Sequence, residues 1–203
     1  DSPEWRSGHT ADCMTFARRG ATPAPAFAHA VHAGARRAAG EAMRAAQTAA
    51  RKPRRGPPLR ARPHHLIDII TQYGAGQPFA PCDYGHAVHT VAARVIGDPQ
   101  TLIEFVVGAD DICDPCKHLV DGRCDDGVPA LGPTASKQEY NDALDERLMQ
   151  FLGITEGQTM TFREYISVLR DHWDGLVEQC AHPGESPAER AVMLERGLAK
   201  LEG

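Results

Sequence analysis

The sequence contains few aromatic residues and no long apolar run. Phe, Trp and Tyr together make up 6% of the 203 residues, so aliphatic side chains must fill most of any core. No stretch of about 18 apolar residues occurs, so we expect no membrane-spanning helix. No basic stretch followed by an apolar segment marks the start of the chain, so we expect no secretory signal. The cytoplasm is the predicted location.

The motifs of several common enzyme classes are also absent. The glycines at Gly74 and Gly76 lack the third glycine and the preceding strand of a dinucleotide-binding fingerprint, and no Walker P-loop occurs. Neither a serine nucleophile motif nor an H-E-x-x-H zinc motif is present. These absences exclude the most recognisable nucleotide-binding and hydrolase families. They leave open whether the protein is an enzyme.

Charge divides the chain into two parts. Residues 1–58 carry a balance of +6 and residues 59–203 a balance of −11, which together give the net charge of −5. We therefore predict a basic Ala/Arg/Pro-rich arm over residues 1–58, disordered or partly helical, and a folded domain over residues 59–203. Phosphate contacts need clustered Lys and Arg, so the acidic domain is not expected to bind nucleic acid.

The pattern of the domain predicts a mainly α fold, with one short strand or a small two-stranded ribbon and a cysteine-rich metal loop. Pro63 suits the first turn of a helix over residues 64–73. A second helix is expected over residues 84–96, where Val88, Val91, Ala92 and Val95 share one face. The short β-branched segment Leu102–Val107 predicts a strand. Residues 108–133, rich in Gly, Pro and Asp, are predicted to form a loop.

Three further helices are expected toward the C-terminus. Ser136, Thr161 and Ser186 each precede a glutamate by three residues, the capping-box pattern in which side chains satisfy free backbone N–H groups. Apolar residues then recur at helical spacing, which indicates faces packed on a core. These residues are Tyr140, Leu144, Leu148 and Phe151, then Phe162, Ile166, Leu169 and Trp173, and finally Ala191, Leu194, Leu198 and Leu201.

The six cysteines favour a metal or redox site over a disulfide framework. Three of them, Cys113, Cys116 and Cys124, lie within twelve residues. A C-x2-C turn lets two thiolates converge on one centre, and Cys124, after Gly122, brings a third. Soft thiolates select iron–sulfur clusters, zinc or copper(I) over hard cations. A disulfide, or three unrelated core cysteines, is the alternative interpretation.

Such a centre needs a fourth ligand, and the spacing of the other candidates leaves several open. His64 and Asp68 lie four residues apart on one helical face, where a plain hydrogen bond is as good an explanation as ligation. Cys82, His86 and His89 would share a face if the second helix began early. Cys180 and His182 would have to fold back from far along the chain, and Cys180 is better explained as a small buried apolar residue.

Two motifs resemble the bacterial and archaeal family catalogued as domain of unknown function 1284. They are Arg62-Pro63-His64-His65-Leu66 and the run from Asp110 to Cys116 with the later Cys124, and the resemblance covers about residues 59–155. Members of that family have been suggested to bind an iron–sulfur cluster. In the family the histidine pair is usually followed by two apolar residues and a cysteine, but here Asp68 takes the place of that cysteine. Cys82 is therefore our predicted closing ligand, with His64 and His65 hydrogen-bonded near the cluster and Asp68 orienting His64.

The resulting hypothesis is an iron–sulfur protein with a redox or regulatory role and an unidentified redox or protein partner. A 4Fe–4S cluster is favoured over 2Fe–2S. The first alternative is a zinc-stabilised binding module without catalysis, because Cys3His is a common closed zinc site. The second is a metalloenzyme with an open site lined by His64, His65, Asp68, His86 and His89.

Overall fold

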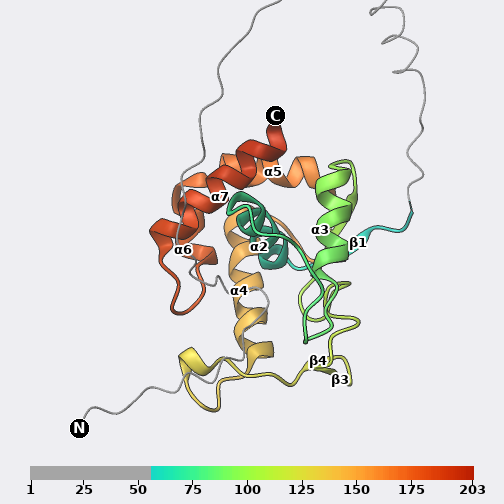
Figure 1. Cartoon of the computed structure of the whole chain (residues 1–203), viewed down its shortest axis with the longest axis vertical. Coiled ribbons are helices and arrows are strands. Elements are labelled where there is room, and N and C mark those ends of the chain that lie inside the picture. Colours follow the sequence, from blue (N-terminus) through green and yellow to red (C-terminus); the bar gives the residue numbers. More distant parts are fainter. Residues whose placement is uncertain (1–55) are drawn as a thin grey trace, which may run out of the picture. The chain divides into compact units, whose positions relative to one another are not determined.

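The computed structural model describes residues 56–203, so the predictions for the arm and for Cys13 lie outside the described residues. Within that range the protein is mainly helical, as predicted (Figure 1). The helices are α2 (Pro63–Gly74), α3 (Val88–Gly97), α4 (Lys137–Leu152), α5 (Phe162–Asp171), α6 (Trp173–Cys180) and α7 (Pro187–Glu202). None of the helices in the described range is long and apolar enough to cross a membrane.

The strands form one small sheet and one hairpin. The sheet has the order β1–β2–β5, in which β2 (Leu102–Phe105) pairs in parallel with β1 (Leu59–Ala61) and antiparallel with β5 (Thr159–Thr161). The hairpin joins β3 (Leu119–Val120) to β4 (Arg123–Cys124). The strand predicted at Leu102 is confirmed, although it ends at Phe105, and the sheet around it was not expected.

Helix α2 is the centre of the fold (Figure 1). It packs against α7 and α4, and Leu66, Ile67, Ile69 and Ile70 have no exposed surface. A helix buried on every side brings its polar residues into the interior, where each polar group needs a partner. His64, His65 and Asp68 on α2 are accordingly buried, which places three predicted site residues inside the molecule.

The close contact of α2 with α7 depends on two glycines. A Cβ on Gly197 would meet the carbonyl of Ile70, and a Cβ on Gly74 would meet the carbonyl of Met193, both far inside van der Waals contact. The helix backbones therefore touch directly at this crossing. Since α7 follows the segment that carries His182, the crossing also fixes that segment near α2.

The C-terminal helices begin where their caps predict. Ser136, Thr161 and Ser186 each accept a hydrogen bond from the glutamate N–H three residues on, and at Thr161 the reciprocal bond completes the capping box. The second of the three predicted helices differs: the run from Phe162 to Trp173 is not one helix, because α5 ends at Asp171 and His172 (φ −110°, ψ 23°) separates it from α6. The chain thus has four helices here instead of three.

Candidate metal centre and its pocket

A buried aspartate shapes the turn that carries Cys113 and Cys116. Oδ1 of Asp110 accepts hydrogen bonds from the N–H groups of Ile112 at 3.1 Å and Cys113 at 3.0 Å. This aspartate turn is followed by a second tight turn, in which the Cys116 N–H donates to the Cys113 carbonyl at 2.8 Å. Both cysteine side chains are partly exposed free thiols, so both are accessible to a ligand at the surface of the turn.

The β3–β4 hairpin returns Cys124 to the same place. Its two turn residues, Asp121 (φ 50°) and Gly122 (φ 77°), both have positive φ, as a type I′ turn requires and as Asp-Gly favours. The register pairs Leu119 with Cys124. The N–H of Cys124 donates to Oε1 of the buried Gln138 at 2.7 Å, which ties the hairpin to the first turn of α4.

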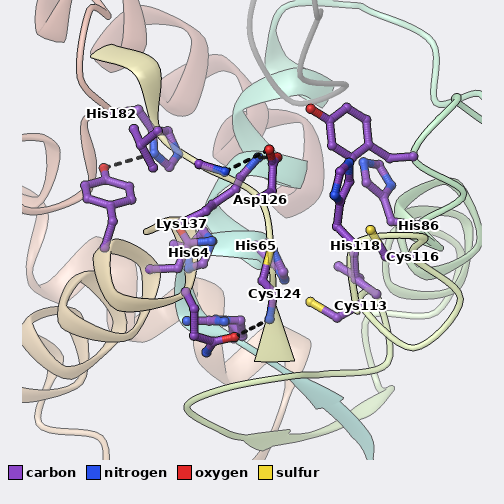
Figure 2. A pocket seen from close by; sticks show the side chains of 18 of the residues that line it. His64, His65, His86, Cys113, Cys116, His118, Cys124, Asp126, Lys137 and His182 are labelled. Carbon is purple, nitrogen blue, oxygen red and sulfur yellow. Dashed lines mark hydrogen bonds and ion pairs between the residues drawn. The ribbon is translucent and has the colours of Figure 1, made fainter. Parts of the chain in front are cut away.

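The three cysteines line one cavity of about 300 Å³. Figure 2 shows their side chains around this space together with the neighbouring histidines. The histidines that line the cavity are His64, His65, His86, His118 and His182. The predicted combination of thiols and imidazoles is therefore brought together by the fold, from a turn, a hairpin and a buried helix.

His64 is held by a carboxylate from α4. Its Nδ1 lies 2.8 Å and 2.9 Å from the two oxygens of Asp145, which also accepts a bond from Nε of Arg62 at 2.6 Å. Burial lowers the pKa of His64 to about 4, against the opposing pull of Asp145. Because an ionised carboxylate only accepts, the neutral ring carries its proton on Nδ1, and Nε2 keeps a lone pair.

His65 has a similar arrangement with a different carboxylate. Its Nδ1 lies 2.8 Å from Oδ2 of Asp110, and the same oxygen accepts the N–H of Arg62 at 2.9 Å. Burial would raise the pKa of Asp110, but His65 and the backbone of Arg62 hold it well below its usual range. Within the described range, ligand-type atoms of His65, Asp110 and Cys113 lie within 4.8 Å of one another.

The sequence-based prediction that Asp68 orients His64 is wrong. The carboxylate of Asp68 accepts from Nη2 of the buried Arg190 and lies 3.1 Å from Nε2 of His182. Burial alone would raise the pKa of Asp68, but His182 and Arg190 hold it well below its usual range. The reason is that α7, which carries Arg190, packs on α2, and that the segment before α7 brings His182 to the same place.

The remaining predicted ligands lie beside the pocket or away from it. Helix α3 begins only at Val88, so Cys82 and His86 belong to the preceding loop, with Sγ of Cys82 3.5 Å from Nε2 of His86. His86 lines the cavity, whereas Cys82 and His89 do not. Cys82 is not among the free cysteines of the described residues, and Nδ1 of His89 is buried without a hydrogen bond.

Cys180 and His182, proposed together from the sequence, are separated by the fold. Cys180 is fully buried and its sulfur accepts from Nε of Arg190 at 3.3 Å. His182 does reach the cavity, where Nδ1 meets the hydroxyl of Tyr140 at 3.2 Å. Cys180 is therefore part of the hydrophobic core, whereas His182 lines the cavity.

The surroundings of Cys113 and Cys124 favour the protonated thiol. Burial and the nearby Asp110 raise the pKa of Cys113 well above its usual range, and burial raises the pKa of Cys124. A metal binds the thiolate, so binding of a metal at this site would release protons. Metal affinity is therefore expected to rise with pH.

Several groups at the site were missed by sequence reasoning. His118 lies two residues after Cys116, lines the cavity and places Nδ1 2.8 Å from Asp125; a survey of every imidazole in the cysteine loop would have found it. Asp145 and Gln138 carry no local signal, because their partners are distant in sequence. Their roles depend on tertiary contacts alone.

A comparison with protein families identifies the chain. Residues 82–182 match the family described as Protein of unknown function (DUF1284). The chain belongs to this family. No curated protein and no solved structure matches it. The matched DUF1284 region contains Cys113, Cys116 and Cys124; it begins after α2 and continues beyond residue 155, where the resemblance had been expected to end.

Proposed function

We propose that Cys113, Cys116 and Cys124 hold an iron–sulfur cluster, with 4Fe–4S favoured, and that the protein has a redox or regulatory role. The supporting observation is that three free thiols from a turn and a hairpin line one cavity. Thiolates are the ligands that such clusters use. The cluster needs reduced cysteines, so we propose the cytoplasm as the location, with a redox or protein partner still to be identified.

The spacing of the sulfur atoms favours a cluster over a single zinc ion. Zinc binds sulfur at about 2.3 Å in a tetrahedron, which sets neighbouring sulfurs about 3.8 Å apart. Among residues 56–203, the three cysteine sulfurs do not form a group with all distances within 4.8 Å. A cluster accepts wider spacing, because each cysteine binds a different iron atom. The zinc-stabilised binding module is therefore the second choice.

The test is anaerobic purification followed by metal analysis. We expect brown protein with about four iron and four sulfide per chain. Cys113→Ser, Cys116→Ser and Cys124→Ser should each lose most of the iron and the visible absorption. Cys180→Ser is the matched control, since Cys180 is a free cysteine outside the pocket, and it should keep the cluster. Colourless protein with about one zinc per chain would overturn the proposal and support the zinc module.

A metalloenzyme with an open site is a further candidate, favoured by the cavity beside the cysteines. Nε2 of His64 forms no hydrogen bond to the described residues, although His64 is only 2% exposed. An acceptor of this kind at the wall of a cavity of about 300 Å³ suits a small substrate with an O–H or N–H group. If a substrate binds there, His64→Ala should abolish turnover while the iron content remains unchanged.

A further inference from the structure

Three cysteine ligands leave one iron atom of a 4Fe–4S cluster without a protein ligand. The side chains that line the cavity are the candidates for this fourth ligand. We propose that Nε2 of His65 is the fourth ligand, giving a centre with three cysteines and one histidine. This inference rests on the proposed iron–sulfur function. It differs from the sequence-based prediction, in which Cys82 closes the site.

Proximity is the first argument. His65 is the imidazole that joins a cysteine of the site in a group of ligand-type atoms within 4.8 Å, among the residues described. It lies on α2, opposite the turn that carries Cys113, and in Figure 2 its ring points into the space between Cys113 and Cys124. Because α2 is buried in the core, the ring is on a rigid support.

Asp110, the third member of that group, is a supporting residue and not a ligand. Its Oδ1 accepts from the N–H groups of Ile112 and Cys113, and its Oδ2 accepts from His65 and from the N–H of Arg62. Four hydrogen bonds use the full acceptor capacity of a carboxylate. Asp110 therefore fixes both the cysteine turn and the imidazole, which explains why one residue touches the two.

The bond to Asp110 also selects the nitrogen that binds. With its proton on Nδ1, His65 presents the lone pair of Nε2, and no hydrogen bond to Nε2 exists within the described residues. His65 is 8% exposed and lines the cavity, so this lone pair belongs to a largely buried ring at the cavity wall. Metal-binding histidines usually donate their other N–H to a carboxylate in this way, which raises their basicity.

The other side chains of the cavity are less suitable. Asp68 is occupied by Arg190 and His182, and His182 uses both ring nitrogens, on Asp68 and Tyr140. Nδ1 of His64 is held by Asp145 of α4, whereas the partner of His65 is Asp110, which also shapes the cysteine turn. His118 uses Nδ1 on Asp125, in a pair that is partly exposed. Its replacement is therefore the matched control for the replacement of His65.

A histidine in place of a thiolate changes the electrical properties of the cluster. The neutral imidazole removes one negative charge from the ligand set, which favours the reduced state and raises the reduction potential. We therefore expect the potential to fall when His65 is replaced by cysteine. This direction distinguishes a ligand from a residue that merely packs nearby.

The deciding experiment is pulsed electron paramagnetic resonance of the reduced cluster in protein with natural and ¹⁵N-labelled histidine. The wild type should show a strong coupling to a nitrogen nucleus, which changes with the label. His65→Ala should lose the coupling and most of one iron per cluster, whereas His118→Ala should retain both. His65→Cys should keep the full cluster, lose the coupling and lower the reduction potential. This variant replaces His65→Ala as the test if the alanine variant does not fold.

The outcomes separate this inference from the proposed function. An intact wild-type cluster without nitrogen coupling overturns the role of His65, as does a coupling that persists in His65→Ala. In the first case, loss of iron in Cys82→Ala identifies Cys82 as the closing ligand. Wild-type protein without iron and sulfide refutes the cluster itself, whatever His65 does.

Discussion

Nδ1 of His64 lies 2.8 Å from a carboxylate oxygen of Asp145, although 81 residues separate them. Both side chains are buried, and Arg62 completes the group by donating to Asp145. Burial would raise the pKa of Asp145, but His64 and Arg62 hold it below its usual value. The pair joins α2 to α4 beneath the cavity, and it makes stability sensitive to pH.

We predict that the metal-free protein loses stability as the pH falls from about 6.5 toward 4. The folded-state pKa of His64 is about 4, below the unfolded value near 6.5, so the unfolded chain binds an extra proton in this window. Full protonation of the unfolded side chain corresponds to about 3 kcal/mol. Urea unfolding at several pH values checks this. His64→Gln should flatten the slope between pH 6.5 and 4, and an unchanged slope would contradict the assignment.

Asp68→Asn should destabilise the domain by about 3 kcal/mol, because it removes a charge partner of the buried Arg190. Glu202→Gln, which breaks the exposed pair with Arg170, is the control and should cost less than about 1 kcal/mol. Chemical unfolding measures both. Folded Asp68→Asn should keep its iron, since the carboxylate bonds to Arg190 and His182. A folded variant without iron would instead make Asp68 a cluster ligand.

Gly197→Ala should destabilise the protein by more than about 2 kcal/mol, although alanine is the better helix former. The new methyl group would press on the carbonyl of Ile70 and separate α7 from α2. At Gly97, the last residue of α3, nothing lies within 4 Å, so Gly97→Ala should change stability by less than about 1 kcal/mol. Thermal melting of the two variants tests this contrast. Equal melting temperatures would show that the helices are not in direct contact.

Removal of the proposed cluster should loosen the cysteine loop more than the helical core. Ligation energy is partly folding energy, and the short β3–β4 hairpin is the only named helix or strand element within residues 108–128. After oxidative stripping and chelation, amide hydrogens of this loop should exchange faster, while those of α2 remain protected. The melting temperature should fall with them. Uniform protection before and after stripping would mean that the loop carries no metal.

The sequence determined the local features of this protein. Ser136, Thr161 and Ser186 mark their helix starts because an N-cap is satisfied within three residues. Cys113 and Cys116 were identifiable because a tight turn fixes their separation. Asp121 and Gly122 also carried a readable hairpin signal, which would have placed Cys124 opposite Leu119. In each case the interacting groups are neighbours in the chain, so local geometry is sufficient.

Only the tertiary structure decided the partners of the buried charges. Spacing placed Asp68 beside His64 on one helical face, but the interior provided Arg190 and His182 for Asp68 and Asp145 for His64. A buried ionised group is stabilised by whichever opposite charge or hydrogen-bond donor the packing brings near. Here the close crossing of α2 and α7 determines the partners of Asp68, and the position of α4 determines the partner of His64. The spacing of residues along one helix does not encode either pairing.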